Sequence, residues 1–226
     1  MGDATWDGKL PGSGLAVRVL PGHGPGRVRS AVTVMHYLHT VDTENLLSVW
    51  VVGIAGGFEE QDVALGDVLV PDVVVDLGTR KLLGDEPPEF RLQPSPVNGK
   101  LLHFLRSGDF DDALWYQSVS DLPLYPQRVR PSLKMGEGIV CADEVVASDE
   151  WRQELIEAWP KVTGVEMEAG GVAAALLQTA TARPFCVVRG VSDHADPLKS
   201  DTSWRVHAMN AAAILVELSA VAVSRE

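Results

Sequence analysis

The sequence predicts a single α/β domain over residues 1–226 with a mainly parallel or mixed central sheet. Short apolar segments typical of buried strands alternate along the chain with longer segments of helical character. The 226 residues, 46% of them hydrophobic, suffice for one large core and are too few for two comfortable ones. The sequence has neither internal repeats nor a low-complexity tract.

The first half of the chain alternates between strands and a helix. Residues 45–54 are almost continuously apolar, which is typical of a strand buried on both faces, and the glycine-rich run 53–57 predicts a tight turn after it. Residues 78–100 carry several prolines and glycines, which favours an exposed hairpin or loop that could act as a lid. The expected elements are a strand at 15–20, a helix at 27–39, the strand at 45–54 and a strand at 66–75.

The second half continues the alternation. Because ligands of such sheets bind beyond the carboxyl ends of the strands, Gly53, Asp143, Glu168 and Asp193 are expected at one edge. Asp149 is expected near the cap of a helix. The expected elements are helices at 101–106, 149–158, 169–175 and 202–222, and strands at 138–141 and 185–188.

Charge and composition exclude several classes of protein. A formal net charge of −12 disfavours nonspecific binding to nucleic acid or to an anionic membrane. No uninterrupted apolar run reaches the roughly 18 residues of a membrane span, and the polar N-terminus lacks a secretion signal. Cys141 and Cys186 are too few for a disulfide framework and lack metal-ligand spacing, so we expect a protein of the reducing cytoplasm.

Two charged motifs carry the chemistry. Glu166 and Glu168 flank a methionine at the start of a helix rich in small residues. Arg189 lies within the next apolar strand, which runs into Ser192 and Asp193. Carboxylates at a helix start and just past a strand end suit a ligand with hydroxyls at one end and a protonatable base at the other.

Each of these residues also has an ordinary structural interpretation. Asp193 could cap a helix, and Glu166 and Glu168 could interact with a helix dipole. Arg189 could belong to a structural buried ion pair. A buried and unpaired Glu168 would nevertheless be costly without a ligand or a basic partner.

Five segments, in this order, resemble the nucleoside phosphorylase and nucleosidase superfamily. The most specific is the Glu-Met-Glu triplet followed by Arg-x-x-Ser-Asp. The likeness covers nearly the whole chain from Trp6 and is nearest to the methylthioadenosine/S-adenosylhomocysteine nucleosidases and to the purine-nucleosidase modules of effector proteins. The segments are residues 23–28, 53–57, 66–70, 165–168 and 188–193.

The resemblance implies a three-layer α/β/α sandwich and assigns catalytic roles to three residues. Asp193 would be the general acid that protonates the purine, and Glu168 would bind the ribose hydroxyls. Arg189 would hold the attacking water and the catalytic carboxylate.

Further residues would shape the substrate site. Glu166 would support Glu168, Met167 would pack against the sugar, and Ser192 would support the acid. The backbone of Val146 would read the edge of the purine. Val145 takes the position of the family's stacking aromatic residue, so base stacking would be weaker.

The chain departs from the family pattern in two further ways. The family's first strand ends in a segment with a water-activating glutamate, and residues 1–20 match the hairpin after it, so the usual first strand is expected to be missing. Phosphorylases of the superfamily bind phosphate through an arginine and a serine where this chain has Val51 and Ile54, so water is the expected nucleophile. Arg27 is the nearby alternative phosphate ligand, although an exposed arginine at a helix start is the more ordinary interpretation.

The sequence therefore predicts a nucleosidase that hydrolyses the N-glycosidic bond of an adenine-type purine nucleoside or nucleotide, without metal or organic cofactor. The alternatives are a purine nucleoside phosphorylase and a catalytically weak nucleoside sensor. A homodimer is expected, with residues 28–38 as the interface, and neither nucleic acid nor membrane as a partner. His194 could contact a 5′ substituent or tune the acid, or be a solvated surface residue, and His23 is a similar candidate.

Overall fold

The computed structural model describes residues 5–22, 24–41, 43–83, 86–123, 130–179, 183–197 and 203–224. Its strands are β1 (Trp6–Lys9), β2 (Ala16–Val19), β3 (Val49–Gly57), β4 (Val68–Val70), β5 (Val73–Asp76), β6 (Arg80–Leu83), β7 (Glu86–Phe90), β8 (Gln93–Pro96), β9 (Leu133–Met135), β10 (Gly138–Cys141), β11 (Val162–Glu166) and β12 (Phe185–Asp193). Its helices are α1 (Arg27–Thr40), the 3-10 helix η1 (Glu59–Gln61), α2 (Gly99–Arg106), α3 (Asp112–Ser120), α4 (Asp149–Ala158), α5 (Ala169–Leu177) and α6 (Trp204–Ser224).

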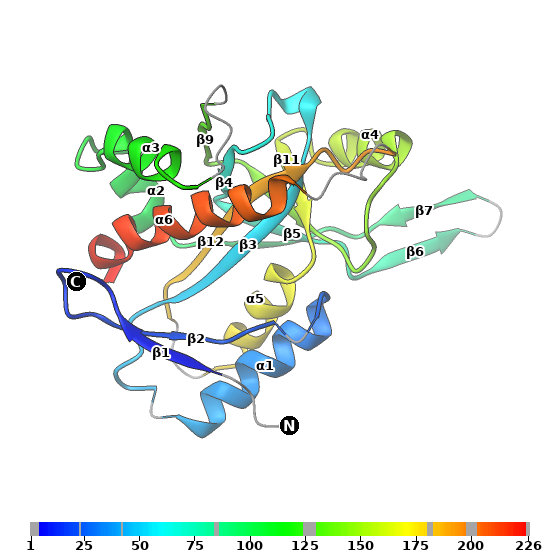
Figure 1. Ribbon diagram of the computed structural model, residues 1–226. Coiled ribbons are helices and arrows are strands. Elements are labelled where there is room, and N and C mark those ends of the chain that lie inside the picture. The colour runs from blue at the N-terminus through cyan, green and yellow to red at the C-terminus, as the bar shows by residue number, and fades with distance from the viewer. Residues whose placement is uncertain are drawn as a thin grey trace.

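A mixed sheet of eight strands forms the centre of the described structure, in the order β8-β5-β10-β11-β3-β12-β4-β9. β3 runs parallel to β12 and antiparallel to β11. Helix α6 crosses β12 and β3 on one face of the sheet, and α2 and α3 pack against α6 on that face. Helices α5 and α1 cover the other face (Figure 1). The predicted α/β class with a mixed sheet between helical layers is confirmed.

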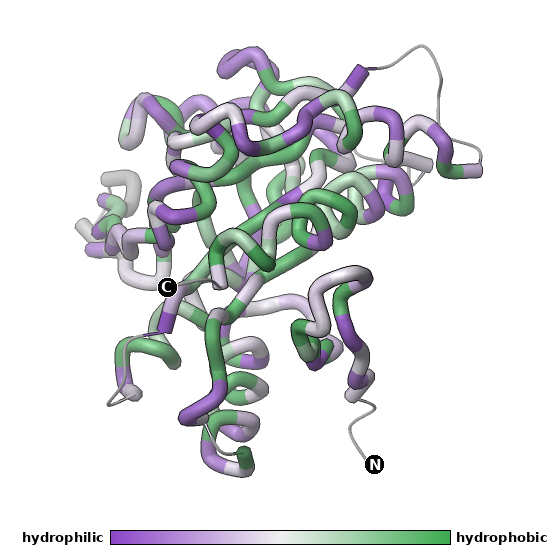
Figure 2. The backbone as a smooth tube through the Cα atoms, turned by 90° about the vertical axis from the view of Figure 1, so that its left-hand side faces the viewer, coloured by the Kyte–Doolittle hydropathy of each residue, from purple (hydrophilic) through white to green (hydrophobic). Residues whose placement is uncertain are grey.

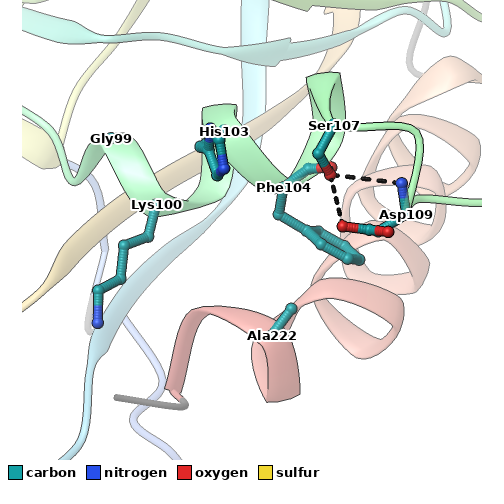
Figure 3. A pocket seen from close by; sticks show the side chains of 7 residues that line it. All are labelled: Gly99, Lys100, His103, Phe104, Ser107, Asp109 and Ala222. Atoms are coloured by element: carbon teal, nitrogen blue, oxygen red, sulfur yellow. Dashed lines mark hydrogen bonds between the residues drawn. The ribbon is translucent and has the colours of Figure 1, made fainter.

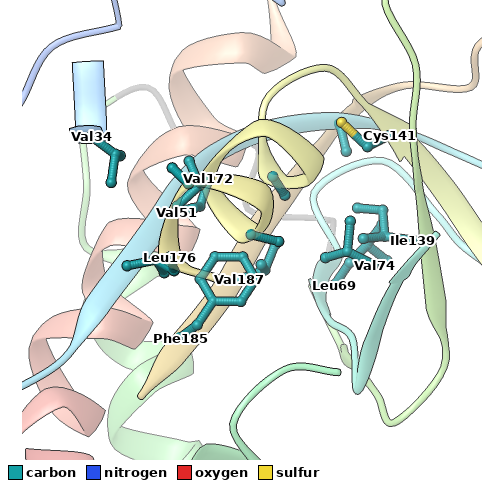
Figure 4. Packing of buried hydrophobic residues seen from close by; sticks show 14 of the residues in the cluster. Val34, Val51, Leu69, Val74, Ile139, Cys141, Val172, Leu176, Phe185 and Val187 are labelled. Carbon is teal, nitrogen blue, oxygen red and sulfur yellow. The ribbon is translucent and has the colours of Figure 1, made fainter. Parts of the chain in front are cut away.

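The core lies where these layers meet the sheet. Side chains of β3 and β12 pack against α5 in one cluster, shown by Val51, Val187, Val172 and Leu176 in Figure 4. A second cluster joins β12 and β4 to α2, α3 and α6. Hydrophobic residues dominate the middle of the molecule and hydrophilic residues its outer loops (Figure 2).

Most predicted elements are confirmed within a few residues of their bounds. The strand expected at 66–75 is wrong as one element, because Pro71 separates β4 from β5 and cannot donate a ladder hydrogen bond. Residues 78–100 form a projecting β6–β7 hairpin and then β8, an edge strand that the sequence did not predict (Figure 1). Helix α3 and strands β9 and β11 were not predicted either.

The glycine-rich run after residue 52 is not a turn. Gly53, Gly56 and Gly57 continue β3, and none of them adopts a positive φ. Glycine is needed there for close approach: a Cβ at Gly53 would collide with the Arg189 guanidinium, and one at Gly57 with Val63 and Val191. These glycines therefore belong to a strand across which side chains of neighbouring elements pass.

The N-terminal strands form a separate two-stranded sheet, β1–β2, which lies beside α1 (Figure 1). Among the described residues, β3 pairs with β12 along its length but with β11 only at Gly56 and Gly57. One side of β3 is therefore without a strand partner from Val49 to Ala55 in the part of the chain described. The absence of a first strand relative to the family stays a prediction.

Helix α6 has 21 residues and a mean hydropathy of 1.7 over its most apolar window, so it passes a length and composition test for a membrane span. Core helices pass the same test, which makes the observation weak evidence for a span. Its Ala208, Ala211, Ala212 and Leu215 are fully buried against the sheet. In this structure one side of α6 packs on the central sheet, and 39% of its most apolar window is buried.

Candidate active site

Arg189 is the buried cation of the site. It lies in the middle of β12 and is 4% exposed. Its Nη2 donates to Glu166 Oε2 and, at 2.9 Å, to Glu168 Oε2. Burial disfavours its charge, but the carboxylates of Glu166 and Glu168 outweigh that and hold the pKa of Arg189 above its usual range. The buried ion pair considered from the sequence is therefore present.

Glu166 ends β11 and has a completely buried side chain. Its carboxylate accepts hydrogen bonds from the backbone N–H groups of Glu168 and Ala169 at 2.9–3.0 Å, in addition to that of Arg189. These N–H groups belong to the start of α5, so Glu166 caps that helix. Every one of these donors is a protein group, which makes Glu166 a support for the residues beside it.

Glu168 presents the accessible carboxylate of the pair. Its side chain is 27% exposed, and it is the residue immediately before α5. Its carbonyl accepts from Ser30 Oγ at 2.8 Å, which ties α5 to α1. An oxygen held by Arg189 on one side and open on the other can accept hydrogen bonds from ligand hydroxyls.

One donor of the Arg189 guanidinium remains available. Its Nε is buried and has no hydrogen-bond partner among the described residues. Buried donors are normally satisfied by protein, water or ligand, so an unsatisfied one beside two carboxylates needs an explanation. The Arg189 side chain crosses the face of β3 at Gly53, its register partner, where a Cβ would collide with the guanidinium.

Asp193 ends β12 at an irregularity of the sheet. The register with β3 shifts between Val191 and Asp193, so that Asp193 lies opposite Gly56. Ser192 Oγ donates to its Oδ2 at 2.9 Å, and the Ala195 backbone N–H donates to its Oδ1 at 3.0 Å. No helix begins at Asp193, since α6 starts at Trp204, so the helix-cap interpretation is wrong.

Asp193 and Arg189 lie on the same strand, four residues apart, which corresponds to roughly 13 Å between their Cα atoms. β3 lies between β12 and β11 and brings Val165 opposite Gly56. The Asp193 carboxyl, the proposed proton donor, thus lies toward the end of β12, and the Glu168–Arg189 ion pair lies about four residues back along the same strand.

The remaining predicted substrate residues lie on β3 and on the loops after β10 and β11. Ile54 is half-buried in β3 opposite Gly190, and Met167 is half-buried between the two glutamates. Val146 is buried in the loop after β10, where it belongs to the same hydrophobic cluster as Ala195. Val145 beside it is 64% exposed. The loop predicted to read the base therefore packs against the turn that follows Asp193.

Arg27 is only partly exposed and is paired with two aspartates. Its guanidinium binds Asp76 and Asp143, each at 2.5 Å, and its backbone N–H donates to Asp143 Oδ1 at 3.0 Å. These contacts lower the pKa of the Asp143 carboxyl. Arg27 does start α1, as the ordinary interpretation had it, but it is only partly exposed, because its guanidinium braces α1 against β5 and the loop after β10. A role as phosphate ligand stays an untested alternative.

His194 is not a solvated residue, since its side chain is 17% exposed and its Nε2 lies 3.3 Å from Glu59 Oε1. His23 lies outside the described residues. The described residues contain no cluster of His, Cys, Asp or Glu able to hold a metal ion. A hollow of about 560 Å³ between α2 and the end of α6 is lined by Lys100, His103, Asp109 and Ala222, and none of the predicted site residues lines it (Figure 3).

The sequence reasoning missed the residues that brace the site. Asp76 binds Arg27, and Arg152 of α4 donates from Nη1 to the carbonyl of His194 at 2.8 Å. Arg152 follows Ser148, which caps α4 by accepting from the Trp151 N–H. An arginine in the first turn of a helix is ordinary, and only its burial distinguishes this one.

With the fold and the site described, the class of protein follows. Residues 5–220 match the family model of the phosphorylase superfamily, and the chain belongs to that family. None of the curated proteins compared with the chain matches it.

Solved structures of nucleosidases share the fold. A 5′-methylthioadenosine/S-adenosylhomocysteine nucleosidase from Colwellia psychrerythraea 34H, in complex with adenine, aligns with a TM-score of 0.71 and 20% identity over 96% of this chain and 81% of that one. The Neisseria meningitidis nucleosidase, in complex with methylthio-immucillin-A, gives 0.68 and 22% over 96% and 84%. Futalosine hydrolase of Helicobacter pylori gives 0.65 and 19% over 97% and 89%.

Proposed function

We propose that the protein is a nucleosidase that hydrolyses the N-glycosidic bond of an adenine-type purine nucleoside or nucleotide. In this reaction the C1′–N9 bond breaks and its electron pair leaves with the base, while Asp193 gives a proton to purine N7. Water then adds to the ribosyl cation at C1′ and releases a proton to solvent. The products are free base and ribose moiety, and no metal or organic cofactor takes part.

The observation that carries the proposal is that β12 holds two functional groups. One is the Asp193 carboxyl, which accepts a hydrogen bond at each oxygen, and the other is the buried Arg189, which pairs with Glu166 and Glu168. Asp193 is oriented by hydrogen bonds to both oxygens, as a general acid must be to reach one atom of a base. Glu168 offers a partly exposed carboxylate for the ribose hydroxyls, where it also faces the positive charge that develops on the sugar.

Arg189 supports water as the nucleophile. Its unsatisfied Nε–H can hold a water molecule against the sugar, and its two carboxylate partners fix the guanidinium. Phosphorolysis, the alternative, would need donors for an anion. Val51 and Ile54 offer only apolar side chains in β3, and Arg27 is occupied by two aspartates.

A nucleoside-binding sensor remains the second alternative, because no residue of this chain matches the family's water-activating glutamate. The binding residues proposed above would be the same, and only turnover would differ.

A cytoplasmic homodimer is part of the proposal. Helix α1 exposes Val28 and Val32, at 72% and 62%, on the face away from its only buried residue, Val34. Apolar side chains in such a row are typical of a helix that packs against a partner. Size-exclusion chromatography with light scattering would test it.

The test of the function is base release from a panel of purine nucleosides and nucleotides, followed by chromatography with and without phosphate. Free base without phosphate is the expected result. Release that depends on phosphate would replace the proposal with phosphorolysis. Binding without any release would replace it with the sensor.

A further inference from the structure

Arg152 of α4 is a buried arginine close to the proposed acid, and the reaction described above does not use it. The residue is 6% exposed. Its guanidinium lies within hydrogen-bond distance of three partners: Glu60 Oε1 at 2.9–3.1 Å, Asp149 Oδ1 at 3.0 Å and the backbone carbonyl of His194 at 2.8 Å.

The two carboxylates do not explain its burial. The side chains of Glu60 and Asp149 are 39% and 66% exposed, and ion pairs with such solvent-facing groups contribute little to stability. An arginine that served only these partners could remain at the surface with them. The third partner is different, because the His194 carbonyl lies just past the end of β12, beyond its ladder of hydrogen bonds.

The His194 carbonyl and the Ala195 N–H belong to one rigid peptide group. The peptide bond is planar, so fixing the direction of its oxygen also fixes the direction of its N–H. This N–H donates to Asp193 Oδ1 at 3.0 Å. A contact from Arg152 to the oxygen therefore sets the direction of a hydrogen bond to the proposed acid.

The turn needs such a restraint. Ala195 has φ = 54°, a left-handed conformation that costs a residue with a side chain roughly 1–2 kcal/mol. Its methyl group is completely buried against Gly56, where a Cβ would collide with it. The turn is thus held by Gly56 on one side and by Arg152 on the other.

We propose that Arg152 is a positioning residue for Asp193, acting through the peptide group between His194 and Ala195. The inference rests on the proposed function and adds a residue to it. Because a backbone N–H can only donate, it holds Oδ1 as an acceptor, and the proton that is given to the base is placed on Oδ2, whose remaining lone pair accepts the hydrogen bond from Ser192 Oγ. Arg152 thereby selects the oxygen that faces the substrate.

The test compares three purified variants with the wild type. Arg152→Met removes the contact with the His194 carbonyl and keeps the length of the side chain. Glu60→Gln removes a charged partner and leaves the carbonyl contact. Arg106→Met is the matched control, because Arg106 also donates to a backbone carbonyl, that of Met135 at 3.1 Å, far along the chain from the site.

Each protein is assayed with the best purine nucleoside of the panel and with 4-nitrophenyl riboside, whose leaving group departs without protonation. For Arg152→Met we expect kcat on the nucleoside to fall roughly ten- to hundredfold, less than the full contribution of a general acid, with KM within about twofold. The loss on 4-nitrophenyl riboside should be several times smaller. Glu60→Gln and Arg106→Met should stay close to the wild type on both substrates.

The inference is overturned if Arg152→Met keeps the wild-type kcat, or if it loses both substrates equally, as a generally damaged protein would. An equal loss in Glu60→Gln would assign the effect to the ion pair. If Arg152→Met does not fold, Arg152→Leu, which also lacks a donor, is measured in its place with the same criteria. A wild type without any base release would instead reject the proposed function.

Discussion

The central strands β3 and β12 are neighbours with the same direction and matching register, yet their environments differ. Residues 185–192 of β12 are all buried, between β3 on one side and β4 on the other. In β3, Val49, Trp50, Val52, Gly53 and Ile54 are only half-buried. Both strands have helices on both faces, and each has a second ladder partner over only two residues: β11 at Gly56 and Gly57 of β3, and β4 at Arg189 and Gly190 of β12. The difference comes from the backbone around these ladders, because Gly66 and Asp67 also bond to Val191 and Asn98 bonds to Phe185, whereas Val49 to Ala55 of β3 have no such cover on the side away from β12 within the described chain.

The comparison teaches that function uses both environments. The buried strand can hold Arg189, because a fixed network of carboxylates surrounds it. The half-open strand supplies the glycine over which this side chain passes, while the guanidinium itself stays buried and Glu168 is the partly exposed group beside it. A site of this kind needs a rigid strand for its charges and an accessible strand for its ligand.

The largest expected effect is a difference in unfolding free energy between alanine substitutions at Gly190 of β12 and at Gly53 of β3. In Gly190→Ala, the new methyl would collide with the α6 backbone at Ala208, which cannot move alone, so we expect a loss of at least about 3 kcal/mol. In Gly53→Ala, it would meet the end of the Arg189 side chain, so we expect a smaller loss of roughly 1–3 kcal/mol, together with lost turnover. Urea unfolding measures both, and the reverse order would break the comparison.

A second pair removes the same atoms from facing positions. Val188 and Val52 are register partners on one face of the sheet, and Val188 is completely buried whereas Val52 is half-buried. We expect Val188→Ala to cost roughly 2–3 kcal/mol and Val52→Ala about 1 kcal/mol. Urea unfolding measures the two losses of free energy relative to the wild type. Equal losses would show that β3 is as enclosed in solution as β12.

The smallest effect concerns α1, which packs against α5 and is tied to the loop after β10 by Arg27 and Asp143. Because Arg27 lowers the pKa of Asp143, this carboxylate stabilises the fold above its usual pKa of 3.8, and the contribution is lost as pH falls through the lower folded value. The side chain is 43% exposed, so we expect less than about 1 kcal/mol. Asp143→Asn should be less stable than the wild type near pH 7, and the difference should disappear once the pH falls below the lowered pKa of Asp143. A difference that persists after the carboxyl is protonated would contradict this.

The sequence was sufficient for the elements that depend on local pattern. The apolar segment of β10 and the capped helix α4 were predicted with their observed bounds. The roles of Gly53 and Gly56 were not, because the contacts that require glycine come from residues more than a hundred positions away. The strand β8 was missed since its prolines are unusual in strands and are tolerated only at an edge.

The candidate site shows the same division. Its charged motifs were visible as sequence patterns, and the structure brings Glu166, Glu168 and Arg189 together. The contacts of Arg27 and Arg152 were not predictable, because each depends on loops that meet only in the folded chain.

The central claim is that Asp193 is the acid of a hydrolytic site, and one measurement tests it most directly. Base release without phosphate is compared between the wild type, Asp193→Asn and the control Asp62→Asn, whose fully exposed side chain forms an ion pair with Lys134. We predict turnover by the wild type and the control, and a loss of roughly 100- to 10,000-fold in Asp193→Asn with the fold intact. Undiminished turnover by Asp193→Asn would contradict the account.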